Sequence, residues 1–180
     1  MASIRLAYLG GGSSRAAGTM AAFIHNHGTR FAGTEVSLID LDAHRLAIVQ
    51  DIAERMTAAR GLDLRFVATT DQRAGLTDVD AVLSSYRPGG FEARVLDERI
   101  PLSRGVIGQE TQGPGGFFMA LRSIHVLQGV LETLAQVAPG ARVFNYTNPV
   151  NILAQAVTRH TDVPFTSCLL YTSPSPRDHG

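Results

Sequence analysis

Residues 4–27 read IRLAYLGGGSSRAAGTMAAFIHNH, and this stretch decides the fold. The apolar run Ile4–Leu9 predicts a β-strand, and the glycines at 10–12 interrupt it. Ser13 or Ser14 can then cap a helix that continues to about His27. The first turn of a helix presents unpaired N–H groups and the positive end of a dipole, which together favour a phosphate. The stretch therefore predicts a strand–turn–helix unit suited to the pyrophosphate of a dinucleotide.

A second predicted strand, Glu35–Asp40, supports the dinucleotide site. Asp40 ends this strand, where a carboxylate can accept both hydroxyls of an adenosine ribose and repels a 2′-phosphate, which favours NAD over NADP. The glycine pattern is incomplete because Arg15 stands at the third glycine of G-x-G-x-x-G. The alternative is a tight strand–helix turn without a ligand. The residues expected to contact the cofactor are Gly10, Gly11, Gly12, Ser13 and Asp40.

Strands and helices continue to alternate along the chain. Further helices are predicted at about 43–60, 71–76, 116–137 and 149–161, and further strands at 64–68, 80–85 and 142–146. This alternation is typical of a mostly parallel sheet covered on both faces. The predicted fold class is therefore α/β, a Rossmann-type doubly wound sheet like the NAD domain of lactate and malate dehydrogenases.

Composition narrows the class of function. The 180 residues are 44% hydrophobic, which is enough for a buried core, and sixteen basic side chains balance sixteen acidic ones. Without a positive field, we expect no nucleic-acid partner and no anionic membrane partner. We expect a cytoplasmic protein, since the sequence shows neither a membrane span nor a signal peptide and its single cysteine, Cys168, has no partner for an intrachain disulfide.

The central block, residues 86–122, is rich in glycine, arginine and carboxylates. It reads YRPGGFEARVLDERIPLSRGVIGQETQGPGGFFMALR. Glycines permit a close approach of backbone to ligand, and charged side chains among them favour a polar, anionic ligand. We therefore expect the functional site to include this block.

Three motifs carry a resemblance to a known family. LGGGSS, the central block and FNYTNPVNIL resemble the N-terminal half of glycoside hydrolase family 4, especially its 6-phospho-β-glucosidases, over about residues 4–165. GVIGQETQGPGGF is specific to that family, whereas the glycines and TNP also resemble lactate and malate dehydrogenases.

The resemblance implies bound NAD, which oxidises the sugar C3 hydroxyl. A base then removes the C2 proton and the aglycone leaves by elimination. It also implies a divalent metal, usually Mn²⁺, that polarises the sugar oxygens, and a homo-oligomer of the full-length protein.

Two arginines of the central block are candidates for contact with the substrate, one of them by the resemblance. Arg94 matches an arginine that contacts the sugar phosphate, and a guanidinium fork suits that dianion. Its alternative is a helix-surface ion pair with Glu98 or Asp97. Arg87 follows a predicted strand and is expected to contact the substrate or the edge of the cofactor.

Two further residues are carried over. Glu110 matches an acidic residue that increases the basicity of the catalytic tyrosine, and a glutamate at this position points to β-linked substrates. Asn148 matches a substrate-binding asparagine, and its alternative role is the N-cap of a helix that Pro149 starts.

The resemblance stops after Phe165. The family continues there into Cys-Asn-x-Pro, whose cysteine binds the metal, but Leu169 follows Cys168 here. Because CLLYTSPSPRD resembles a translated sequencing adapter, we expect residues 168–180 to be an artefact and accept neither Cys168 nor Tyr171 as functional. The NAD-binding domain is then 1–167, truncated before the second domain. Metal ligands and catalytic tyrosine would lie beyond the truncation, and the fragment would be inactive.

Two other functions stay open at this point. A lactate- or malate-type 2-hydroxyacid dehydrogenase would explain the glycines, Asp40 and TNPV but not the central block. A noncatalytic nucleotide-binding module would explain the first strand–turn–helix unit alone.

Overall fold

The computed structural model describes residues 3–27 and 31–167. The strands are β1 Arg5–Leu9, β2 Thr34–Ile39, β3 Leu64–Thr69, β4 Ala81–Ser84, β5 Arg142–Asn145 and β6 Phe165–Ser167. The helices are α1 Ser14–His27, α2 Ala43–Ala59, α3 Gln72–Leu76, α4 Gly90–Leu102, α5 Gly113–Val137 and α6 Val150–His160. The tail that sequence analysis set apart, residues 168–180 with Cys168, lies outside the described residues.

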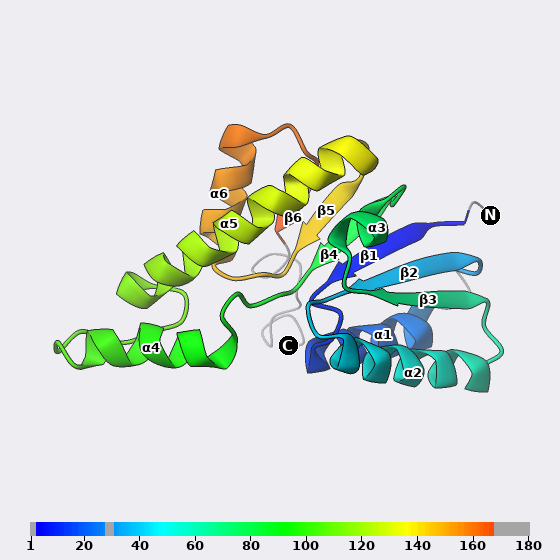
Figure 1. Ribbon diagram of the computed structural model, residues 1–180, viewed down its shortest axis with the longest axis horizontal. Coiled ribbons are helices and arrows are strands. Elements are labelled where there is room, and N and C mark those ends of the chain that lie inside the picture. The colour runs from blue at the N-terminus through cyan, green and yellow to red at the C-terminus, as the bar shows by residue number, and fades with distance from the viewer. Residues whose placement is uncertain (1–2, 28–30, 168–180) are drawn as a thin grey trace, which may run out of the picture.

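The described strands form one parallel sheet in the order β3-β2-β1-β4-β5-β6 (Figure 1). β1 pairs with β2 on one side, with Ala7 opposite Ser37, and with β4 on the other, with Ala7 opposite Val82. This is the strand order of a Rossmann-type fold, in which the direction of winding reverses between β1 and β4. The predicted fold class is confirmed, and ligands are expected where the carboxyl ends of β1 and β4 diverge.

Side chains of β1 alternate between two separate cores. Tyr8 packs with α1 and α2 on one face of the sheet, in a cluster that includes Met20 and Leu46. Ala7 and Leu9 point to the other face, where they pack with residues of α3, α5 and α6. Strand residues that alternate in this way require a helix layer on each side, which Figure 1 shows.

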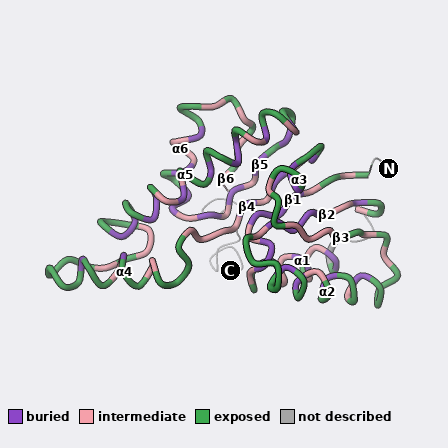
Figure 2. Tube along the Cα trace, viewed as in Figure 1, coloured by how far each residue is buried: buried purple, intermediate pink, exposed green. Residues whose placement is uncertain are grey.

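Helix α4 projects from the sheet, and sequence analysis did not predict it (Figure 1). Its apolar side chains do not follow one buried stripe, because Phe91, Leu96 and Ile100 are exposed. Figure 2 shows most of α4 as exposed. Without a buried stripe, the pattern that marks the other helices is missing. Helix α5 also begins three residues before its predicted start, at Gly113.

Candidate functional site

The turn after β1 is fixed by contacts with the two neighbouring strands. The N–H groups of Gly10 and Gly11 both donate to the carbonyl oxygen of Ile39, at 2.9 Å each. Gly10 has a φ of 88°, and a Cβ placed on it would lie 2.1 Å from the carbonyl oxygen of Ser85. Only glycine fits this position, and the turn is wedged between the ends of β2 and β4.

Of the two serines predicted to cap α1, Ser13 and Ser14, the structure shows Ser13 in this role. Its hydroxyl accepts from the Ala16 N–H at 3.1 Å and donates to the Gly10 carbonyl at 2.8 Å. The N–H groups of Ser14 and Arg15, in the first turn, have no acceptor inside the helix by its geometry. These donors and the helix dipole suit a pyrophosphate.

Asp40 is tied to the glycine turn. Its carboxylate accepts from the N–H of Gly12 at 2.9 Å on Oδ2, and from the N–H groups of Leu41 at 2.8 Å and Asp42 at 3.4 Å on Oδ1. A Cβ on Gly12 would lie 3.2 Å from the same carboxylate. A carboxylate has about four lone-pair sites, so these bonds leave about one for a ligand. The expected contact with two ribose hydroxyls therefore narrows to about one.

A hollow of about 690 Å³ lies beside the first turn of α1. Ser14 and Arg15 line it from the helix, and Leu83 and Tyr146 line it from the ends of β4 and β5. Its walls are mostly apolar, with N–H donors at the helix start. A dinucleotide that enters at the glycine turn would find room here.

The central block brings three of the predicted residues together. Nη2 of Arg87 lies 2.6 Å from Oε1 of Glu110, and Nη1 of Arg94 lies 3.4 Å from Oε2 of the same carboxylate. The Glu110 side chain is 19% exposed, so it is largely shielded from water between the two arginines. Arg87 also stacks over Phe91, with Cζ 5.5 Å from the ring centre. Its contacts here are internal, and its predicted contact with substrate or cofactor stays a prediction.

Arg94 also makes the helix-surface ion pair that sequence analysis gave as its alternative. Nε donates to Oε1 of Glu98 at 2.7 Å, one turn along α4. That hydrogen bond and the charge of Glu110 raise the pKa of the Arg94 guanidinium above its usual value. Glu98 occupies the Nε side, and among the described residues no acceptor bonds to Nη2. The ion pair thus orients the guanidinium and leaves one edge of it for an anion.

Asn148 lies beyond the end of β5 but does not cap α6. The helix starts at Val150 with Pro149 at the N-cap position and no side-chain capping bond. The N-cap alternative for Asn148 is therefore wrong. The side-chain amide of Asn148 forms no hydrogen bond with the described residues, while its carbonyl accepts from the Ser123 hydroxyl at 3.3 Å. The amide is thus available to a ligand, and its predicted role stays a prediction.

A buried polar network that was not predicted from the sequence lies at the ends of β4 and β5. Oδ1 of Asn145 accepts from the Ser84 hydroxyl at 2.7 Å and from the Thr147 N–H at 3.1 Å. The Thr147 hydroxyl in turn accepts from the Tyr86 N–H at 3.2 Å. The signal in the sequence was a polar residue at the end of each of two adjacent strands. The network locks the ends of β4 and β5, from which Arg87 and Asn148 follow.

The side chain of Tyr86, whose N–H belongs to this network, was also not predicted to have a role. Its hydroxyl donates to the Ser123 carbonyl at 3.2 Å. Burial raises the pKa of this phenol above its usual value, so it stays neutral across the physiological range. Tyr86 therefore serves as a packed support between β4 and α5 and not as a base.

The described residues offer no metal site. Among them, no group of three or more His, Cys, Asp and Glu side chains could hold an ion.

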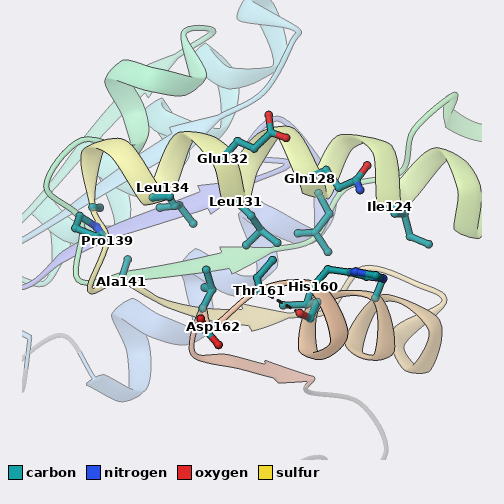
Figure 3. A pocket seen from close by; sticks show the side chains of 16 residues that line it. Ile124, Gln128, Leu131, Glu132, Leu134, Pro139, Ala141, His160, Thr161 and Asp162 are labelled. Carbon is teal, nitrogen blue, oxygen red and sulfur yellow. Dashed lines mark hydrogen bonds between the residues drawn. The ribbon is translucent and has the colours of Figure 1, made fainter.

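A cavity of about 660 Å³ lies apart from the site, with side chains of α5 on one side and the end of α6 on the other (Figure 3). None of the predicted site residues lines it. In the part of the chain that the structure describes, no helix is long and apolar enough to cross a membrane.

Comparisons with known proteins agree with the geometry. Residues 5–166 match the family described as Family 4 glycosyl hydrolase. A 6-phospho-beta-glucosidase of Escherichia coli (strain K12) is 38% identical over 88% of this chain and 35% of its own length. The 6-phospho-alpha-glucosidase 1 of Lacticaseibacillus paracasei is 39% identical over 83% of this chain and 34% of its own. The chain thus spans about a third of these relatives.

Solved structures give the same result. The 6-phospho-beta glucosidase from Thermotoga maritima, solved with manganese, NAD+ and glucose-6-phosphate, has a TM-score of 0.81 at 30% identity. It covers 90% of this chain, which matches 39% of that structure. A lactate dehydrogenase from Eimeria maxima, at 16% identity and a TM-score of 0.63, shares the fold alone. The dehydrogenase alternative therefore has the support of the fold but not of the sequence.

Proposed function

Because the chain belongs to the family 4 glycosyl hydrolases, we propose that it forms the NAD-binding part of an enzyme that hydrolyses 6-phospho-β-glucosides. The observation that carries the proposal is Glu110 held between Arg87 and Arg94 in the block that distinguishes this family from dehydrogenases of the same fold. Below, the whole protein means the longer protein of which this proposal makes the chain a part.

The residues present fit NAD. The glycine turn leaves space that side chains would fill, the first turn of α1 presents N–H donors, and Asp40 keeps about one acceptor site for a ribose hydroxyl. Bound NAD would supply reversible oxidation of the sugar C3 hydroxyl, which acidifies the neighbouring C2 proton. Oxidation and return of the same hydride leave the cofactor unchanged over one turnover.

A sugar phosphate would take the free edge of Arg94. The four charged groups Arg87, Arg94, Glu98 and Glu110 sum to zero, so the cluster attracts no anion by net charge alone. Recognition would instead come from the geometry of the guanidinium, which Glu98 orients. Asn148 would add a neutral amide to the sugar hydroxyls. The substrate is thus expected to be selected by fit at close range.

Glu110 would act on the catalytic tyrosine of the whole protein. A carboxylate near a phenol makes loss of the phenolic proton harder and its recapture easier, which strengthens the phenolate as a base. The preference for β-linked substrates rests on the resemblance of this glutamate. Relatives of both α and β specificity match the chain at nearly equal identity.

The remaining parts of the active site are assigned to the whole protein. Since the described residues do not fit a metal, the proposal places the Mn²⁺ ligands elsewhere in it. We place it in the cytoplasm as a homo-oligomer, in line with the family resemblance. Release of p-nitrophenol by the 180-residue chain alone would contradict this division.

The test measures hydrolysis of p-nitrophenyl 6-phospho-β-glucoside by the whole protein with NAD and Mn²⁺. We expect Arg94→Ala to raise KM by about tenfold or more, since a charged hydrogen bond to the phosphate is lost. Arg55→Ala is the matched control, because Arg55 makes an exposed i,i+4 pair with Asp51 on α2. The α-anomer of the substrate tests the assignment of Glu110. No turnover of either anomer by the wild-type protein would refute the proposed function.

A further inference from the structure

Helix α4 is attached to the fold through one neighbour. Among the described helices and strands, only α5 contacts it extensively. Figure 1 shows α4 and the N-terminal end of α5 projecting from the sheet, and the loop between them carries Glu110. Whatever fixes α4 against α5 therefore fixes Arg94, which lies on α4.

Among the apolar side chains of this helix, only Pro101 is buried. Phe91, Leu96 and Ile100 are between 57% and 72% exposed. The residues that α4 buries are Asp97 and Pro101. A carboxylate, 7% exposed, thus lies at the centre of the contact between the two helices.

Asp97 is paired with Arg122 of α5. Nη1 of Arg122 donates to Oδ1 at 3.1 Å, and Nη2 donates to Oδ2. The third donor, Nε, lies 3.4 Å from the carbonyl oxygen of Pro88, just before α4. Two parallel bonds from a planar guanidinium fix orientation as well as distance. Arg122 therefore connects α5 both to the middle of α4 and to the backbone that precedes its N-terminus.

The backbone contact beside this pair is equally close. A Cβ on Gly115 would lie 2.8 Å from the carbonyl oxygen of Asp97 and 2.4 Å from that of Gln109. Glu98, which orients Arg94, is the next residue after Asp97. A rotation of α4 about its axis would move Glu98 and Arg94 together relative to Glu110.

We propose that Asp97 and Arg122 are positioning residues whose ion pair sets the placement of Arg94 in the sugar-phosphate site. The inference rests on the proposed function, since it takes the sugar phosphate as the ligand of Arg94. Neither residue is assigned a contact with the ligand. Their effect reaches it through the register of α4 against α5 and through the Glu98–Arg94 pair.

A purely structural pair predicts a different outcome. If the ion pair only stabilised the fold, folded variants would keep normal affinity for the phosphorylated substrate. If it positions Arg94, folded variants lose affinity for the phosphate while NAD binding at the glycine turn is unaffected. The two roles are therefore separated by comparing KM with kcat and with the Kd of NAD.

The experiment compares Asp97→Asn, Arg122→Lys and the double variant of the whole protein. Arg122→Lys keeps the positive charge but lacks the guanidinium that bonds to both carboxylate oxygens of Asp97. This variant therefore tests the inference even if Asp97→Asn fails to fold. For p-nitrophenyl 6-phospho-β-glucoside we expect KM to rise about tenfold and kcat to change by less than about threefold. The KM of the double variant is expected to be no higher than that of the single variant with the higher KM, because the two residues act as one unit. Asp51→Asn, at an exposed pair, is the control.

Hydrogen exchange separates failure of the inference from failure of the proposed function. Amides of 90–102 are expected to exchange faster in Arg122→Lys than in the wild-type protein, with α1 unchanged. Unchanged exchange in α4, or an unchanged KM in a folded variant, overturns the positioning role. Wild-type protein that turns over neither anomer refutes the proposed function, and exchange in α4 then still decides whether the pair fixes this helix.

Discussion

Replacing Gly10 by alanine should destabilise the fold through two separate effects. At a φ of 88° an alanine pays about 1–2 kcal/mol for left-handed backbone. The new Cβ would also lie 2.1 Å from the Ser85 carbonyl oxygen, which is backbone and cannot rotate away. Relieving such overpacking costs about 1–3 kcal/mol. We expect a total loss in free energy of unfolding of about 3 kcal/mol.

Urea denaturation measures this loss. With an m-value of about 2 kcal/mol per molar, the midpoint for Gly10→Ala should fall by about 1.5 M. Gly18→Ala is the matched control, because Gly18 lies inside α1 and a Cβ there meets no atom within 4 Å. This control should gain about 0.5–1 kcal/mol from better helix propensity. The reasoning is refuted if the two variants unfold at the same urea concentration.

Three further substitutions test the site and its supports. Asp40→Asn should raise the Kd of NAD about tenfold, measured by fluorescence titration, since a hydrogen bond to a charged group is weakened; unchanged affinity would remove Asp40 from the cofactor site. Ser13→Ala should cost about 1 kcal/mol in urea by removing the cap of α1, and no loss would show that the cap contributes nothing. Burial raises the pKa of Tyr86, so above pH 10 the unfolded phenol ionises while the folded one stays neutral, and stability falls as pH rises. Between pH 9 and 11 the wild-type protein should lose about 1.4 kcal/mol more than Tyr86→Phe, and parallel pH profiles would contradict this sign.

Most of the sheet was predictable because its signals are local, and of the described strands only β6, Phe165–Ser167, was not predicted. Each of the other strands is a short, mostly apolar run, and the helices that cover them carry a buried stripe. Helix α4 carries no such stripe, since its contact with α5 is made by Asp97, whose partner is 25 residues away. No pattern within a short window of sequence could reveal that partner.

Three residues that the sequence singled out, Arg87, Arg94 and Glu110, lie together in the structure, and their roles toward a ligand stay predictions. The contacts between them could not be predicted from the sequence. The internal acceptors of Asp40 depend on how the turn folds back on it, and they use three of its about four lone-pair sites. These internal hydrogen bonds of Asp40 could not be predicted from the sequence, and its contact with a ribose stays a prediction.

The attachment of α4 through α5 has a consequence for divergence within the family. Residues 87–112 leave the sheet after β4, and the chain returns to it through α5. This segment contributes no strand to the sheet. Substitutions on the outer side of this segment disturb neither strand pairing nor the two sheet cores. Residue changes in this segment can therefore alter the surroundings of Arg94 and Glu110 while the glycine turn after β1 keeps its geometry.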